Sequence, residues 1–335
     1  MSDPNRSGLT VAALGALSLV CAATAPVFAA TPQAVAQGVW LIPGGMLPNR
    51  EPDGNTVILE APAGLIVVDT GRHRWHRDAI LAFADARAEK IVAIVNTHWH
   101  LDHVSGNRAL RAAFPALRVY ASDAIERALP GFLASSAKDS AAYLDDPNVS
   151  ESLRDDIRAD LTTIQDGAAL KPDVIVAASR EFSLGGRQLQ INLAPNAATA
   201  GDLWLYDATS RVAVLGDLVT LPAPFLDTAC PDGWQAALAR VEATPFRIAI
   251  PGHGAPMTRA QLSLYRTAFE ALIGCSDSVS PEGECAARWA TSIRSLIAPD
   301  AQATQQAKGI ATYYVGMLRA NGGRSKYCEA PPSAG

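Results

Sequence analysis

The sequence lacks a basic stripe, a low-complexity tract and any pair of cysteines separated by two residues. Its 28 Lys and Arg residues are scattered among 33 acidic ones, so nucleic acid is not expected as a partner. With 49% hydrophobic and 18% charged residues, the composition is that of a folded protein and excludes extensive disorder. The 335 residues suffice for one large domain or two ordinary ones.

The N-terminus carries an apolar run, Leu9–Val20, which leads into small residues. The run is shorter than the roughly 20 residues that cross a bilayer, so we expect a signal peptide over 1–29 rather than a membrane anchor. Cleavage after Ala29 is favoured, and cleavage after Ala30 stays open. The mature protein is then expected to be periplasmic or secreted and not bound to the membrane.

Removing this segment leaves an even number of cysteines in an oxidising compartment: Cys230, Cys275, Cys285 and Cys328. Two disulfides are therefore expected, with three possible pairings. We favour Cys275 with Cys285, which closes a short loop, and hence Cys230 with Cys328. Buried free thiols are the alternative, and a thiolate metal site is not expected because zinc-ribbon spacing is missing.

Hydrophobic periodicity predicts a chain that alternates strands and helices. Strands are expected at 38–42, 56–60, 64–68, 91–95 and 118–120 in the first half, and at 173–177, 188–193, 203–206, 212–215 and 248–251 in the second. Helices are expected at 75–87, 105–114, 124–129, 233–242 and 258–273. Two such halves with polar residues at strand ends indicate an α/β fold, a four-layer αββα sandwich with its active site along one edge.

We expect one domain over 30–320, followed by a tail over 321–335. It carries a helical insertion at about 130–167 and a helical extension from about 286. In the insertion, apolar residues fall on one helical face, as expected for a packing helix more than for a substrate lid: Leu153, Ile157, Leu161 and Ile164.

Three histidines and an aspartate follow the predicted strand 91–95 within eight residues of its end: His98, His100, Asp102 and His103. Strand alternation puts His98 and His100 on the same side, and the following turn aims the other two at an adjacent point. Imidazole and carboxylate suit zinc, with iron or manganese as possible substitutes. The spacing therefore predicts a metal centre in which one loop serves two ions.

This H-x-H-x-D-H run resembles the signature of the metallo-β-lactamase superfamily. The resemblance extends from about Val39 to Gly254, because Asp69, Asp217 and His253 recur in the family's order. It implies that His98 and His100 belong to a first metal site, and Asp102, His103 and His253 to a second. It further implies that Asp217 bridges both ions and that Asp69 is a buried acid that orients the ligands.

One position departs from the family pattern. The family supplies a further first-site histidine in a His-Thr-x-Gly-Asp segment, where this sequence has Ala198 followed by Thr-Ala-Gly-Asp. A methyl group cannot bind a metal, and the amide oxygen of Asn196 is a weak ligand for zinc. His73 and His76 are expected to be solvent-exposed histidines at the rim, and the alternative is that they fold over the site and compensate for Ala198. We therefore predict one tightly held ion in the second site and one weak or absent ion in the first.

The resemblance implies a hydrolase whose metal-bound hydroxide attacks an ester, lactone, thioester, amide or phosphoester. Asp102 or Asp217 would orient the water and move its proton. An aspartate at 217, where β-lactamases usually have Cys or Ser, favours branches similar to glyoxalase II and lactonases. The alternatives are a non-catalytic metal-binding accessory protein and, less expected, a β-lactamase or an iron oxygenase.

The expected partner is a small-molecule substrate. Three segments without a recognisable motif are expected to line the substrate pocket: 43–54, 130–167 and 222–227.

Overall fold

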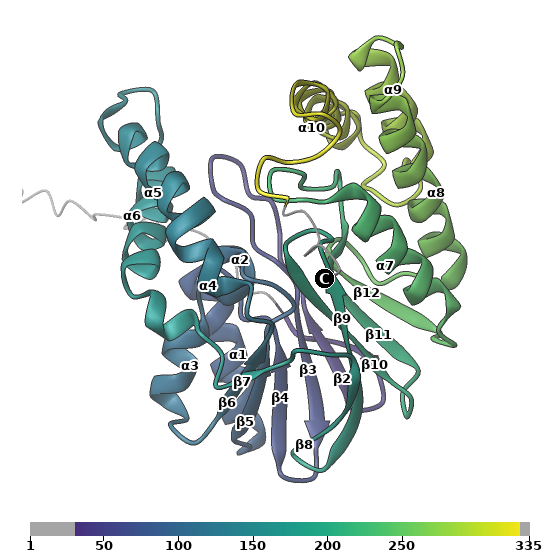
Figure 1. Cartoon of the computed structure of the whole chain (residues 1–335). Helices are drawn as coiled ribbons and strands as arrows, with labels where there is room; N and C mark the ends of the chain where they lie inside the picture. The colour runs from purple at the N-terminus through teal and green to yellow at the C-terminus, as the bar shows by residue number, and fades with distance from the viewer. Residues whose placement is uncertain (1–30, 329–335) are drawn as a thin grey trace, which may run out of the picture.

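The computed structural model describes residues 31–328, so the expected signal peptide and the end of the expected tail lie outside the described residues. Two β-sheets pack face to face, and helices cover both outer faces (Figure 1). This is the αββα sandwich that the sequence predicts. No helix of the described part is both long and apolar enough to cross a bilayer.

The first sheet is seven-stranded, antiparallel from β1 to β4 and parallel from β4 to β7. Every residue of β4 is buried, because the sheet is covered on both faces. The expected placement of strand 173–177 among the strands of the second half is wrong, since Tyr120 pairs with Val174 at the edge of the first sheet. The strands are β1 (Gln33–Ala36), β2 (Val39–Ile42), β3 (Thr56–Ala61), β4 (Gly64–Val68), β5 (Ile91–Val95), β6 (Arg118–Ala121) and β7 (Val174–Ile175).

The second sheet is five-stranded, and only its pair β11 and β12 is parallel. β1 and β8 are strands that the hydrophobic runs do not predict, because both lie at sheet edges and most of their residues are partly or fully exposed. In spatial order the strands are β12 (Ile248–His253), β11 (Val212–Thr220), β10 (Gly201–Asp207), β9 (Arg187–Pro195) and β8 (Arg180–Leu184).

Three apolar layers hold the sandwich together. Side chains of both sheets, including Ile66 and Leu203, form the layer between the sheets. The outer face of the first sheet packs against α1 (Arg74–Arg87) and α3 (Asn107–Ala113) through residues such as Ile80. The outer face of the second sheet packs against the later helices. These are α7 (Pro231–Ala243), α8 (Arg259–Ser276), α9 (Glu282–Ser292) and α10 (Ala301–Ala320).

The insertion rises from the first sheet as a helical arm (Figure 1). Of its predicted apolar face, Ile157 is buried, whereas the other three residues are partly exposed. The helices of this region are α4 (Ile125–Ala128), η1 (Leu129–Leu133), α5 (Ala134–Ala141), η2 (Ala142–Asp145), α6 (Glu151–Gln165) and η3 (Gly167–Leu170).

The C-terminal extension is fastened by two disulfides, and their pairing is the favoured one. Cys275 bonds to Cys285, and Cys230 bonds to Cys328 across 98 positions of sequence. The predicted helical stretch from 286 consists of two helices rather than one. Pro299 lies just before α10, and the Asp300 side chain caps this helix by accepting a hydrogen bond from the Ala303 amide.

Candidate metal centre

The predicted site residues come from separate elements that meet at one edge of the sandwich. The histidine run follows β5 and continues into the short helix α2 (Leu101–Val104). Asp217 lies within β11, and His253 ends the neighbouring parallel strand β12. Because the carboxyl ends of parallel strands meet at one edge, residues far apart in sequence converge there.

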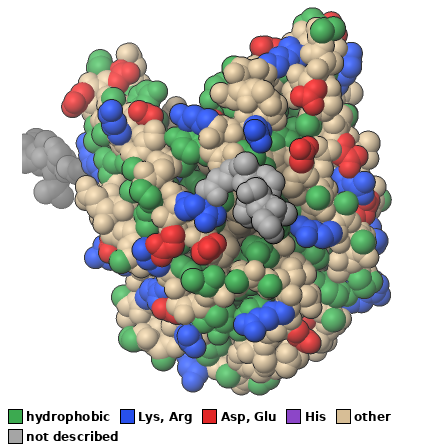
Figure 2. Space-filling model, in the orientation of Figure 1, with side chains coloured by type: hydrophobic (Ala, Val, Ile, Leu, Met, Phe, Trp, Pro, Cys, Tyr) green, Lys and Arg blue, Asp and Glu red, His purple; other side chains and the backbone are tan. Residues whose placement is uncertain are grey.

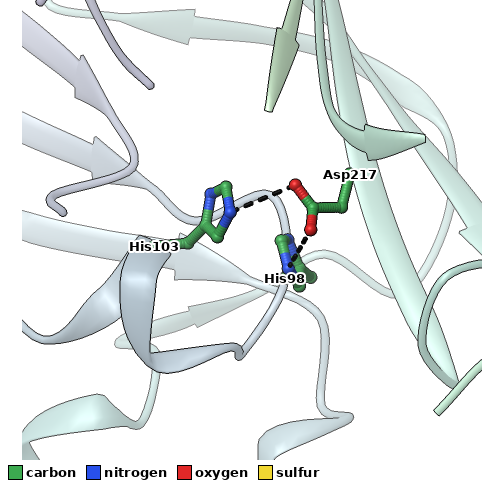
Figure 3. Close-up of side chains that lie close together, drawn as sticks. All are labelled: His98, His103 and Asp217. Atoms are coloured by element: carbon green, nitrogen blue, oxygen red, sulfur yellow. Dashed lines mark ion pairs between the residues drawn. The ribbon is translucent and has the colours of Figure 1, made fainter. Parts of the chain in front are cut away.

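We call His98, His100 and Asp217 the first group. The Nε2 atom of His98 lies 2.9 Å from Nδ1 of His100 and 3.7 Å from Oδ2 of Asp217. All three side chains are buried. Figure 3 shows Asp217 between His98 and His103, with one carboxylate oxygen toward each ring.

We call Asp102, His103 and His253, together with the shared Asp217, the second group. His253 Nε2 lies 2.9 Å from Asp102 Oδ2, and His103 Nε2 lies 3.1 Å from Asp217 Oδ1. The Nε2 atoms of His103 and His253 are 3.3 Å apart. Ring nitrogens and carboxylate oxygens thus converge on one point, and His103 lies within reach of the first group as well.

Hydrogen bonds to the Nδ1 atoms of His98 and His103 orient both rings, so that the Nε2 atom of each points toward this place. Asp69 accepts from the Thr97 amide and the Thr97 hydroxyl, each at 2.7 Å, and from His103 Nδ1 at 2.8 Å. Because the Thr97 hydroxyl uses its one hydrogen in the bond to Asp69, its oxygen accepts a hydrogen bond from Nδ1 of His98 at 3.0 Å. The Nε2 atoms of His98 and His103 are therefore left to face Asp217.

Burial and charge set the protonation of the centre. Burial lowers the pKa of His100 to about 4 and holds that of His98 well below its usual value. Burial raises the pKa of the Asp217 carboxyl, but the nearby His103 and His253 outweigh it, and the pKa lies below its usual range. Neutral imidazole and ionised carboxylate are the forms that bind metal ions.

The negative charge of the centre attracts a cation. Burial lowers the pKa of His103, yet Asp217, Asp102 and Asp69 together raise it well above its usual value. In addition, Asp217 Oδ1 is buried and makes no hydrogen bond. A divalent ion would satisfy this oxygen and replace the proton on His103. The donor set therefore fits one or two metal ions.

Ala198 is buried in the apolar layer beneath α7, and its methyl group offers no donor atom. Asn196 lines a different hollow, beside Cys230 and Arg324. Neither residue is among the groups of donors that the described part brings together for a metal ion.

The expectation that His73 and His76 are solvent-exposed is wrong, because both side chains are buried. His73 bonds to Asp53 through Nδ1 at 2.7 Å and lies 3.2 Å from Asp156 through Nε2. His76 Nε2 lies 2.8 Å from the Thr56 hydroxyl. Both rings are thus engaged away from the first group.

A cavity of about 710 Å³ opens over the centre and is lined by His100, Asp102, Asp217 and His253. Figure 2 shows the hollow between the arm of α5 and α6 and the arm of α9 and α10. The three segments expected to line the pocket all contribute to its wall: Met46, Glu51 and Pro52; Phe132, Ser136 and Asp160; and Pro222, Phe225 and Asp227.

Other wall residues were not predicted. Tyr313 and Tyr314 enter from α10, and their hydroxyls donate to Asp227. Arg72 enters from the segment before α1, where it pairs with Asp160 and lies 3.8 Å from Asp102. Helical periodicity indicates which face of a helix is buried, but it does not indicate which cavity that face lines. No local pattern in the sequence therefore identifies these residues.

The comparisons with known proteins agree with this geometry. The family model of the metallo-beta-lactamase superfamily matches residues 50–261. The chain therefore belongs to the metallo-beta-lactamase superfamily, whose members include metal-dependent hydrolases.

Two curated relatives are hydrolases. The linear primary-alkylsulfatase of Pseudomonas sp. is 27% identical over 225 residues, which are 60% of this chain and 41% of that protein. The hydroxyacylglutathione hydrolase of Gloeobacter violaceus is 55% identical over 72 residues, 22% of this chain and 27% of that protein. The chain thus spans less than half the length of these relatives.

Solved structures share the fold. A metallo-beta-lactamase from Pontibacter korlensis superposes with a TM-score of 0.53 at 19% identity, covering 72% of this chain and 98% of that one. The stereoselective inverting sec-alkylsulfatase from Pseudomonas sp. gives a TM-score of 0.57 at 17% identity, covering 90% of this chain and 52% of that one. At these identities the likeness concerns the fold alone.

Proposed function

We propose that this protein is an exported hydrolase with a two-part metal centre. His98, His100 and Asp217 would hold one ion, and Asp102, His103, His253 and Asp217 the other, with Asp69 orienting His103. The observation that carries the proposal is the convergence of ring nitrogens and carboxylate oxygens on Asp217. Zinc is the metal we favour, and the same donors suit iron or manganese.

When bound, the metal supplies a Lewis acid that lowers the pKa of a coordinated water to about 7. Asp102 and Asp217 both line the cavity, and either carboxylate would orient a water bound there and move its proton. An apolar substrate in this cavity would displace water from the centre and so strengthen each of these electrostatic contacts.

We propose that the second group binds its ion more tightly than the first. The second group offers four donors, whereas the first offers two imidazoles and a share of Asp217. Losing a direct ligand at position 198 ought to cost at least the 10–100-fold that outer contacts typically contribute to metal affinity.

The cavity favours a substrate with a bulky apolar group. Aromatic and aliphatic side chains form most of its wall, among them Trp99, Phe132 and Phe225. Besides the aspartates of the centre, the wall carries Glu51, Asp160 and Asp227 but a single arginine, Arg72, which already pairs with Asp160. An apolar ester, lactone or alkyl sulfate fits this wall better than a thioester of glutathione with its two carboxylates.

Export and domain boundaries complete the proposal. We infer a signal peptide over 1–29, a catalytic domain over 30–320 and a tail over 321–335. Two disulfides support an oxidising compartment such as the periplasm.

Position 198 favours a second candidate function, that of a metal-binding accessory protein without turnover. Hydrolysis of a panel of substrates decides between the two. The panel contains p-nitrophenyl esters of increasing acyl length, lactones, primary alkyl sulfates, phosphodiesters and a hydroxyacylglutathione, each with metal-depleted and zinc-reloaded protein. We expect zinc-dependent turnover that rises with apolar chain length. Metal binding without turnover of any member would favour the accessory protein.

A further inference from the structure

Thr228 lies beside the histidine pair of the first group, on the loop between β11 and α7. Its side chain is buried, with 2% of the residue exposed. The Thr228 hydroxyl lies 3.0 Å from Nε2 of His100 and 2.8 Å from the backbone oxygen of Ala198. It therefore joins a candidate metal ligand to the position where the family's histidine is missing.

The direction of these two hydrogen bonds is fixed by chemistry. A carbonyl oxygen only accepts, so the single hydroxyl proton of Thr228 goes to Ala198. The bond to His100 must then run the other way, with Nε2 as the donor and the Thr228 oxygen as the acceptor. His100 thus carries its proton on Nε2, and the lone pair of its Nδ1 meets the lone pair of His98 Nε2 2.9 Å away, an arrangement that a shared cation would satisfy.

The same arrangement recurs at the neighbouring ring. The Thr97 hydroxyl donates to Asp69 and so accepts from Nδ1 of His98. Each imidazole of the first group therefore donates a hydrogen bond to a threonine oxygen, because the hydroxyl hydrogen of that threonine is bonded to another acceptor. Such contacts fix the tautomer and the ring orientation of metal-binding histidines.

The loop that carries Thr228 is fastened on both sides. The amide of Cys230 donates to Ala197 at 2.9 Å, and its sulfur is bonded to Cys328. The amide of Ser325 donates to Ala229 at 3.2 Å, so the C-terminal segment holds this loop in place. The Phe225 ring packs edge-on against His100 at 5.0 Å.

We propose that Thr228 is the positioning residue that holds His100 in its metal-binding form, and that position 198 serves the centre through its backbone oxygen rather than through a side chain. The inference rests on the proposed metal centre. It explains how the first group holds two imidazoles in fixed orientations without a third.

The test compares Thr228→Val, which removes the hydroxyl at nearly constant volume, with Thr228→Ser, which keeps it. Thr199→Val is the matched control, since it removes another buried hydroxyl close to Ala198, one that bonds the Gly201 amide and the Asp202 side chain but no candidate metal ligand. Metal-depleted full-length protein is titrated with Co²⁺ and followed by visible absorption. The imidazole nitrogens of the metal-free protein are followed by ¹⁵N NMR.

We expect Thr228→Val to weaken the weaker Co²⁺ equivalent by 10–100-fold and leave the tighter one unchanged. We also expect its His100 signals to move toward the tautomer protonated on Nδ1. Thr228→Ser and Thr199→Val should retain wild-type behaviour in both measurements.

Wild-type signals in Thr228→Val, or a Thr228→Ser variant that behaves like valine, would overturn the role of Thr228. Failure of the wild-type protein to bind Co²⁺ would instead refute the proposed metal centre. The NMR comparison would still show which nitrogen of His100 carries the proton when Thr228 is present. A thermal melt of each variant verifies that it is folded.

Discussion

The two groups of the candidate metal centre are supported in different ways. The second group draws its side chains from α2, β11 and β12, and a buried aspartate, Asp69, fixes His103. The first group shares Asp217, but its His100 depends on Thr228, which belongs to a loop without regular structure. That loop is fastened by a disulfide to a segment near the C-terminus.

The difference indicates that the second group is held by elements of the sandwich, whereas one ring of the first group also relies on a loop without regular structure. Strands fix side chains through many backbone hydrogen bonds, whereas a loop relies on a few anchors. We therefore expect changes at the second group to affect the tighter ion, and changes at the first group to affect the weaker one.

Replacing the shared carboxylate, Asp217, should weaken metal binding at both groups and so remove the difference in affinity between them. In Asp217→Asn the size is kept and the charge is lost, so both ions lose a charged donor and at most a weak amide oxygen remains. We expect turnover to fall at least about a thousandfold, because a metal centre contributes several kcal/mol to lowering the barrier. Steady-state kinetics and metal analysis check this, with the exposed Asp155→Asn on α6 as the control. Near-normal turnover would show that Asp217 is not shared.

Single histidine variants should separate the groups. We expect His253→Gln to weaken the tighter ion and His100→Gln to weaken only the weaker one, each by 10–100-fold or more. Co²⁺ titration of both variants measures the two affinities. Equal effects of the two substitutions on both ions would contradict the division into two groups.

Restoring the family's histidine at position 198 should make the metal affinities of the two groups more similar. We expect Ala198→His to tighten the weaker ion by at least about tenfold, since a third imidazole becomes available. Ala198 is buried, so the larger ring should also cost about 1–3 kcal/mol of stability. Metal titration and chemical denaturation measure both effects. An unchanged weaker affinity in a folded variant would show that the site excludes a ligand at this position.

His73 belongs to neither group, so its replacement is expected to change the stability of the fold without changing metal affinity. Burial lowers its pKa, but bonds to Asp156 and Asp53 outweigh this and raise the pKa to about 9. A pKa raised by folding stabilises the protein fully below about pH 6.5, and this contribution is lost as the pH rises through about 9. We expect His73→Gln to lower the melting temperature by a few degrees at pH 6 and by much less at pH 10.

Metal affinity should not change in the His73→Gln variant at either pH. A melting-temperature difference that stays constant from pH 6 to pH 10 would show that the charge of His73 is not what stabilises the fold.

The layered fold and the histidine run follow from local patterns in the sequence. Buried strands such as β4 and β5 are short continuous apolar runs, and the residues after them are polar because the chain leaves the sheet there. The convergence of Asp217 and His253 on the run is not a local property. It was expected only because these residues recur in a known family's order.

Residues whose roles depend on distant partners could not be predicted from the sequence. The burial of His73 depends on Asp53 and Asp156, which come from two other segments. A lone threonine such as Thr228 carries no signal, since its role arises from a backbone oxygen and a ring that the fold brings together. Edge strands, with few buried residues, are missed for a similar reason.

The central claim is that the second group holds an ion more tightly than the first. Metal analysis of purified, zinc-loaded protein after exhaustive dialysis tests it most directly. The account predicts one retained equivalent per chain, with a second that returns only when zinc is added back. Two equivalents retained after dialysis, or none at any zinc concentration, would contradict it.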